Sequence, residues 1–146
     1  MFTFVAAAAS SHKESEYVHW RIPGFVTVPV SLDGNCMFAS IAHQLHFLGR
    51  DPQQRSAAAV RQELVEYIRI SSDMHSVLSS ALDVSDSLEQ YLSRMAQDGT
   101  WGDGNILSAA YRLYHYPVHV FTEDAQVPTV IGDSNAIMLA WTRVTQ

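Results

Sequence analysis

The sequence predicts a single α/β domain in which helices flank a small β-sheet. Short β-branched runs that alternate as in strands stand at residues 24–30, 118–122 and 136–144, and segments with helical spacing fill the region between the first two. The chain has 146 residues, of which 47% are hydrophobic. It is therefore long enough to bury one core and too short for two comfortable domains.

The first half of the chain contains a strand, a turn and two helices. Residues 24–30 (GFVTVPV) have a strand-like alternation, and residues 33–36 (DGNC) have the composition of a turn. Helical spacing follows over residues 37–48, with Gly49 well placed to end the helix. Ser56 is expected to cap a second helix. The apolar stripe of that helix consists of Ala57, Val60, Leu64, Tyr67 and Ile68.

The third quarter of the chain is predicted to be helical with one glycine-rich interruption. A short helix covers about residues 74–82, and Ser85 is expected to open another. Residues 97–105 (QDGTWGDGN) form a loop because they hold three glycines. The apolar spacing of residues 106–114 predicts a further helix, which Pro117 stops.

Two strands are expected to close the domain. Residues 118–122 (VHVFT) are typical of a buried strand, residues 123–135 of an exposed connection, and residues 136–144 of a last strand. At the other end, residues 1–16 are rich in alanine, serine and charge and are expected to form a loose or helical leader. The predicted domain therefore covers residues 17–146.

The composition argues against several classes of partner. The formal net charge is −6, and the Lys and Arg residues are scattered, so a nucleic-acid-binding face is not expected. No apolar stretch approaches the roughly 20 residues that span a bilayer, so no membrane association is expected. A single cysteine rules out an internal disulfide and predicts an intracellular protein, in cytoplasm or nucleus. No paired Cys/His spacing or HExxH motif predicts a metal, and no cofactor is expected.

Cys36, the only cysteine, lies where the turn enters the first predicted helix. A thiol attacks as its thiolate, and the free N–H groups and partial positive charge of a helix N-terminus stabilise that anion. The same N–H groups, with the backbone of the turn, are able to receive an oxyanion. A lone cysteine beside an apolar helix is, however, more often a packing residue. Position alone therefore leaves both roles open.

Three blocks of the sequence resemble the ovarian-tumour (OTU) family of cysteine proteases. They are VTVPVSLDGNCMFASIAHQL (residues 26–45), YLSRMAQDGTWGDGNILSAAYRLYHYPVHVFTED (residues 91–124) and IMLAWTRV (residues 137–144). The Asp-Gly-Asn-Cys tetrapeptide is moderately specific by itself, and the three blocks in this order and spacing are strongly specific. The resemblance implies a papain-like cysteine protease fold of OTU type and a deubiquitinase, a thiol hydrolase of isopeptide bonds after the C-terminal glycine of ubiquitin.

The resemblance also implies roles for the residues of the first block. Cys36 would be the nucleophile, and Asp33 would shape the active-site loop before it. The backbone of Gly34, Asn35 and Cys36 would form the oxyanion hole. For Asp33, a turn or cap residue without a catalytic role is an equal alternative.

In the second block, Trp101 and Gly102 would hold a loop beside the channel that admits the substrate tail. For Trp101 the alternative of a core anchor beneath the loop is the stronger one. The implied partner is ubiquitin or polyubiquitin, with a ubiquitin-like modifier as a variant.

The general base expected from the family is not found in the sequence. The family pattern continues past the last strand into a histidine followed by an aromatic residue, whereas this sequence ends at Gln146. His43 and His46 lie on the helix that Cys36 opens; at 1.5 Å per residue, His43 is about 10 Å from Cys36 along the axis, too far for a hydrogen bond. His115 and His119 are the remaining candidates, and both are weak.

We therefore expect the chain as written to be inactive or much weaker than a complete family member. Three explanations stay open: a truncated enzyme whose last strand ends just before the histidine, a natural pseudo-enzyme that still binds ubiquitin, and a base supplied from elsewhere, including a partner chain. The second explanation amounts to an alternative function, a ubiquitin-binding module without catalysis.

Overall fold

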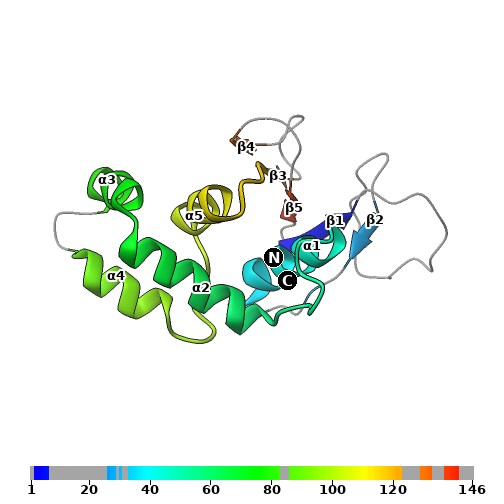
Figure 1. Cartoon of the computed structure of the whole chain (residues 1–146), viewed down its shortest axis with the longest axis horizontal. Helices are drawn as coiled ribbons and strands as arrows, with labels where there is room; N and C mark the ends of the chain where they lie inside the picture. The colour runs from blue at the N-terminus through cyan, green and yellow to red at the C-terminus, as the bar shows by residue number, and fades with distance from the viewer. Residues whose placement is uncertain are drawn as a thin grey trace.

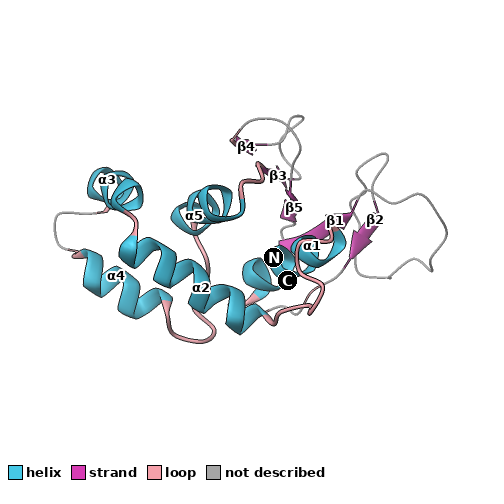
Figure 2. Ribbon diagram, viewed as in Figure 1, coloured by secondary structure: helices cyan, strands magenta, loops and turns pink. Residues whose placement is uncertain are grey.

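The computed structural model describes residues 2–6, 26–28, 30, 33–82, 86–122, 129–132 and 137–141. Within these ranges, five helices and five strands follow one another in the order ββαααααβββ. The helices α2 to α5 gather in one layer, and α1 lies between them and the strands (Figure 1; Figure 2). None of these helices is long and apolar enough to cross a membrane.

The five strands form one mixed sheet in the order β2-β1-β5-β3-β4. The strands are β1 (Phe2–Ala6), β2 (Val26–Val28), β3 (Val118–Thr122), β4 (Thr129–Ile131) and β5 (Ile137–Trp141). β3 and β5 are parallel, and the other three pairings are antiparallel. The strand predicted at residues 118–122 is confirmed with the same bounds. The strands predicted at 24–30 and 136–144 are confirmed with shorter ones.

Two sequence-based expectations about the sheet were wrong. Residues 1–16 were expected to form a leader outside the domain, but β1 lies inside the sheet, between β2 and β5. Its register pairs Phe2 with Trp141 and Phe4 with Val28. Likewise, the connection expected at 123–135 contains β4, which pairs with β3 at the sheet edge. Both strands are stabilised by pairing with other strands, so local composition does not reveal them. Residues 7–25 lie outside the described residues.

The helices largely follow the predicted spacing. They are α1 (Cys36–Phe47), α2 (Ala57–Ile70), α3 (Ser72–Ala81), α4 (Leu88–Met95) and α5 (Gly104–Tyr114). The Ser56 side chain accepts a hydrogen bond from the N–H of Ala59, so its predicted capping role is confirmed. Ser85 was expected to open α4, but Ser87 does so through a capping box with Gln90.

The sequence predicts that α1 ends at Gly49 and that Pro117 ends α5. In the structure, left-handed backbone conformations end both helices. Gly49 has a φ of +70°, which a residue without a Cβ adopts at little cost after α1. At the end of α5, His115 takes the left-handed conformation with a φ of 58°, two residues before Pro117. The proline therefore stands just beyond the cap rather than ending the helix itself.

The core lies where α1 packs between α2 and the strands β1 and β5. α2 occupies the centre of the helical layer, because it contacts α1, α3, α4 and α5 (Figure 1). The buried side chains that join these elements include Phe38, Ile41, Leu45, Val60, Leu64, Ile68, Tyr91, Leu92, Ile106 and Val118.

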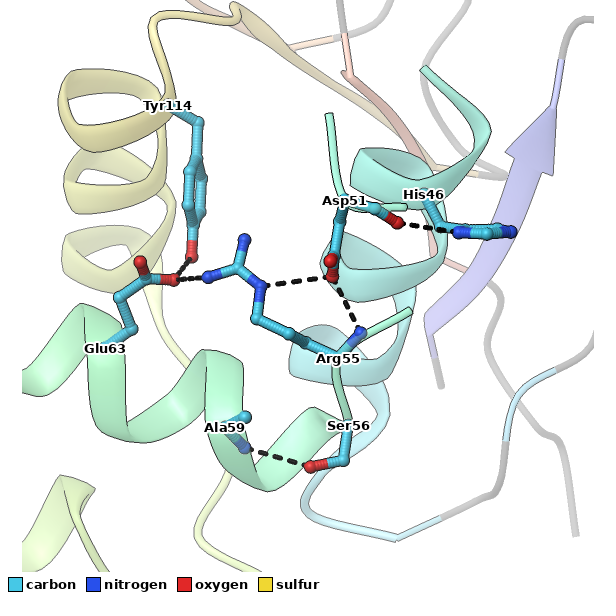
Figure 3. Close-up of polar contacts among 7 residues, drawn as sticks. All are labelled: His46, Asp51, Arg55, Ser56, Ala59, Glu63 and Tyr114. Carbon is cyan, nitrogen blue, oxygen red and sulfur yellow. Dashed lines mark hydrogen bonds and ion pairs between the residues drawn. The ribbon is translucent and has the colours of Figure 1, made fainter. Parts of the chain in front are cut away.

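A polar cluster joins the loop after α1 to α2 and α5 (Figure 3). The buried Asp51 carboxylate accepts hydrogen bonds from the backbone N–H (2.7 Å) and the Nε (3.0 Å) of Arg55. Arg55 also pairs with Glu63 on α2, which accepts the hydroxyl of Tyr114 at 2.6 Å. The backbone N–H of Arg55, more than its side chain, holds the pKa of Asp51 below its ordinary value. This cluster fixes the start of α2 against α5 without touching Cys36.

Candidate active site

Cys36 is the first residue of α1, and the turn before it is closed by Asp33. The Oδ1 of Asp33 accepts the N–H of Asn35 at 2.9 Å, and the Asp33 carbonyl accepts the N–H of Cys36 at 3.2 Å. Asn35 is the N-cap residue of α1 but provides no side-chain cap, and the first turn of the helix holds no acidic residue. The thiol therefore stands at the positive end of a helix dipole with no carboxylate in that turn to oppose it. The residue is 1% exposed.

The predicted oxyanion hole is closed in this arrangement. The N–H groups of Asn35 and Cys36, two of its three predicted donors, both point to oxygens of Asp33. An oxyanion that used these donors would have to displace the Asp33 oxygens, so the turn must change before the hole accepts a charge. Asp33 therefore closes this turn with both its carboxylate and its carbonyl oxygen.

Residues 33–36 are called the nucleophile turn, after the role predicted for Cys36. This turn packs directly on the glycine-rich loop of residues 97–105. A Cβ atom on Gly34 would lie 1.6 Å from the carbonyl oxygen of Gly99, so the two backbones touch at a place where only glycine fits. The Asn35 side chain joins the same two segments. Its Nδ2 donates to Asp98 Oδ1 at 3.1 Å, and its Oδ1 accepts the N–H of Gly99 at 3.3 Å. The first and second sequence blocks therefore meet beside Cys36.

Asp103 anchors the far end of the glycine-rich loop to α5. Its Oδ1 accepts the N–H groups of Asn105 at 2.9 Å and Ile106 at 3.1 Å, as the N-cap of the helix. The hydroxyl of the buried Tyr91 donates to the same oxygen at 3.0 Å. Burial, and then the charge of Asp103, raise the pKa of Tyr91 above its ordinary value. The phenol therefore stays protonated as a donor.

Trp101 and Gly102 lie in this loop with different surroundings. The Trp101 side chain is 54% exposed, so it does not serve as a core anchor beneath the loop. Gly102 faces Met37 of α1, because a Cβ atom there would lie 2.5 Å from the Met37 sulfur. The loop thus packs on the residue next to Cys36 and presents the Trp101 ring to solvent, and the substrate-channel role of the two residues stays a prediction.

Arg61 is the site residue that sequence reasoning missed. It lies on α2, is 2% exposed, and donates four hydrogen bonds to the segments that surround Cys36. Its position in the predicted helix could have identified it. Residue 61 lies on the same helix face as Leu64, Val65 and Ile68, which are all buried. An arginine in an apolar stripe is unusual and indicates a buried set of acceptors.

His43 and His46 lie along α1 as the sequence predicted. Burial, and then the charge of His46, lower the pKa of His43 below its ordinary value. The Nδ1 of His46 contacts the carbonyl of Asp51 at 2.8 Å, at the opposite end of α1 from Cys36 (Figure 3). Both belong to the packing of the helix and the loop that follows it.

His115 and His119 were the candidates left for the general base. His115 is exposed and forms the left-handed cap of α5. His119 lies on β3 between Val118 and Val120, which pack on the helical core, so strand alternation turns His119 to the opposite face of the sheet. Among the described residues, no hydrogen bond joins a histidine to the Cys36 thiol. The base stays unidentified in this part of the chain.

The sequence profile described as OTU-like cysteine protease matches residues 31–144, which include Cys36, the glycine-rich loop and β5. The chain belongs to this family. A solved structure of the Hazara virus OTU bound to ubiquitin superposes with a TM-score of 0.58 over 79% of this chain and 73% of that one, at 21% identity. This likeness confirms the predicted fold, a small sheet flanked by helices.

Two proteins with similar sequences have names that refer to ubiquitin or to deubiquitination. Ubiquitin thioesterase otu2 of Schizosaccharomyces pombe is 27% identical over 110 residues, which are 71% of this chain and 35% of that protein. Ovarian tumor domain-containing deubiquitinating enzyme 10 of Arabidopsis thaliana is 32% identical over 98 residues, 67% of this chain and 25% of that protein. The chain thus spans about a third or less of the length of these relatives.

Proposed function

We propose that this chain is the catalytic domain of a ubiquitin thioesterase, in which Cys36 is the nucleophile. One observation carries the proposal: Cys36 opens a helix at a turn that is docked on the glycine-rich loop through Gly34 and Asn35. The substrate would be ubiquitin or polyubiquitin joined through an isopeptide bond. The site of action would be the cytoplasm or the nucleus, where a single unpaired thiol stays reduced.

The proposed reaction has two steps. The Cys36 Sγ attacks the carbonyl carbon of the C-terminal glycine of ubiquitin, and the oxyanion collapses as the C–N bond breaks. The amine leaves with the proton that a general base took from the thiol, and a thioester remains. Water then attacks the thioester carbonyl, which releases the carboxylate and regenerates the thiol. Opening of the Asp33 turn would free the N–H groups of Asn35 and Cys36 for the oxyanion in both steps.

A ubiquitin probe with an electrophile at its C-terminus tests the proposal directly. The probe is incubated with residues 1–146, with the complete gene product, and with the Cys36→Ala form of each. We expect a covalent adduct of one ubiquitin per chain that is lost in Cys36→Ala. Alkylation of unfolded protein at the same cysteine is the positive control for the thiol. Absence of an adduct with every protein tested that retains Cys36 would refute the assignment.

The alternative function, a ubiquitin-binding module, is favoured by one observation. Two of the three predicted oxyanion donors, the N–H groups of Asn35 and Cys36, are bonded to oxygens of Asp33. Titration of ubiquitin into the protein, followed by NMR or calorimetry, separates the two functions. Saturable binding that Cys36→Ala leaves unchanged, together with no turnover of diubiquitin by the complete gene product, would support binding alone.

A further inference from the structure

We propose that Arg61 is the positioning residue of the site, which holds the nucleophile turn and the glycine-rich loop in register through a single guanidinium group. The inference rests on the proposed function, because it assigns Arg61 to the presentation of Cys36 to a substrate. Nothing in the reaction requires Arg61 to touch the substrate, so it would act through the turn and the loop that it joins.

The hydrogen bonds of Arg61 connect two segments that are distant in sequence. Its Nη2 donates to the carbonyl of Gly34 at 3.1 Å and to Asn35 Oδ1 at 2.6 Å, both in the nucleophile turn. The carbonyl of Thr100 lies 2.7 Å from the same nitrogen, whose two hydrogens are therefore shared among three acceptors, and Nη1 donates to the carbonyl of Met95 at 2.8 Å. One planar group thus spans the turn before Cys36 and both ends of the segment between α4 and Trp101.

An aromatic contact fixes the plane of the guanidinium. The Phe38 ring lies under it, 3.9 Å from the Arg61 Cζ to the ring centroid. Phe38 is fully buried in the first turn of α1, two residues after Cys36. Arg61 therefore contacts the chain on both sides of the nucleophile, at Gly34 and Asn35 before it and at Phe38 after it. A shift of the guanidinium would therefore move the backbone on both sides of Cys36.

The energetics of the site argue that Arg61 does more than fill space. Burial lowers the pKa of Arg61 below its ordinary value, which shows the cost of holding this cation away from water. No carboxylate among the described residues bonds to the group, and its Nε has no hydrogen-bond partner among them. An apolar side chain of similar volume would avoid this cost. What an apolar side chain lacks is the set of donors that ties the carbonyls of two loops together.

Arg61→Lys is the informative substitution. Lysine keeps the positive charge, but its single nitrogen does not reproduce the planar fork that reaches both segments. Arg69→Lys is the matched control, because Arg69 lies on the same helix with its side chain 42% exposed and pairs only with surface glutamates. Leu64→Ala is the second control: it is a buried change on α2 that destabilises the protein without removing a hydrogen bond to the turn.

The first readout is the labelling rate with the ubiquitin electrophile over a range of probe concentrations. We expect Arg61→Lys to lower the rate at saturating probe about 10- to 100-fold, the range that misplacement of a reacting group by about 1 Å produces. The half-saturating concentration should change less than threefold, because Arg61 does not line the ubiquitin surface. Arg69→Lys should match the wild type. A change confined to the half-saturating concentration would overturn the positioning role.

The second readout needs no ubiquitin and remains informative where the proposed function fails. Iodoacetamide alkylation of Cys36 in the native protein reports how tightly the turn is held, since the residue is 1% exposed. We expect Arg61→Lys to be alkylated at least threefold faster than Leu64→Ala at denaturant concentrations where the two have equal unfolding free energies. Equal rates would mean that Arg61 acts through global stability alone, and the proposal would be wrong.

Asn35→Ala provides the same test if Arg61→Lys does not fold. It removes one acceptor of the Arg61 Nη2 and both side-chain bonds from the turn to the loop, while the other three hydrogen bonds of Arg61 can remain. The expected pattern is the same: faster alkylation than in a variant of equal stability and slower labelling by the ubiquitin probe at saturation. Wild-type rates of Asn35→Ala in both assays would refute the proposal that these hydrogen bonds hold the turn against the loop.

Discussion

Gly34→Ala should separate the nucleophile turn from the glycine-rich loop. The new Cβ atom would lie 1.6 Å from the Gly99 carbonyl oxygen, and contacts under 3.0 Å essentially never occur. Because the obstacle is backbone, the two segments have to move apart by roughly 1.5 Å. Arg61 Nη2 donates to Gly34 on one side and Thr100 on the other, so this movement breaks at least one of the two hydrogen bonds.

The magnitude follows from these two effects. Overpacking costs about 1–3 kcal/mol, and loss of a buried hydrogen bond to a charged group costs about 1.5–3 kcal/mol. We therefore expect the unfolding free energy to fall by about 3–5 kcal/mol. For a chain of this size, that corresponds to a Tm lower by roughly 10 °C. Urea and thermal unfolding followed by circular dichroism measure both values.

Gly104→Ala is the matched control for this prediction. Gly104 also lies at the glycine-rich loop, but no atom comes within 4 Å of a Cβ built on it. As the first residue of α5, it should tolerate alanine with no loss of stability, or with a gain of about 0.5–1 kcal/mol. If Gly34→Ala unfolded at the same urea concentration as Gly104→Ala, the close approach of turn and loop would be refuted.

Three further predictions concern other parts of the chain. Asp103→Ala should lower the unfolding free energy by about 2–4 kcal/mol, because it removes the α5 cap and an acceptor of the buried Tyr91 hydroxyl. Thermal unfolding should show a smaller loss of stability for Asp103→Asn. Gly49→Ala should cost about 1 kcal/mol in urea unfolding because its φ is +70°, with no effect on labelling by the ubiquitin probe. The folded-state pKa of His43 lies below the unfolded value, so wild-type stability should fall as pH drops below about 6.5; urea unfolding at pH 7.5 and 5.5 should show a smaller drop for His43→Gln.

Each of these has a contradicting result. A wild-type Tm in Asp103→Ala would mean that the cap contributes nothing to α5. An unchanged midpoint in Gly49→Ala would mean that the end of α1 relaxes without strain. For His43→Gln, a pH dependence between pH 7.5 and 5.5 equal to that of the wild type would assign the acid sensitivity to groups other than His43.

Sequence predicted the elements that local pattern determines. The helices α1 and α2, the Ser56 cap and the strand β3 carry their own periodicity and capping residues, so their placement does not depend on the rest of the fold. β1 and β4 were missed because their stability comes from strand pairing, and one of the two partners of β1 is β5, which follows much later in the chain. The sequence placed the start of α4 at Ser85, whereas the structure places it at Ser87, where the reciprocal bond with Gln90 caps the helix.

The roles that the sequence assigns to the site residues stay predictions, and the structure bears on where those residues lie. The resemblance assigned Cys36, Asp33 and Trp101 to the site, and the structure places the segments that hold them side by side through the contacts of Gly34 and Gly99. The closed oxyanion donors and the role of Arg61 depend on where loops distant in sequence meet. No periodicity encodes such a meeting.

The position of β1 has a consequence for how the protein is made. β1 pairs with β5, so the centre of the sheet joins the start of the chain to a segment near residue 140. Contacts between such distant residues carry a large loop-closure entropy and form slowly. During synthesis, β1 can pair with β2 early, but its other edge stays open until β5 has been made. The helical layer can assemble in that interval, whereas the strands against which α1 packs are completed last.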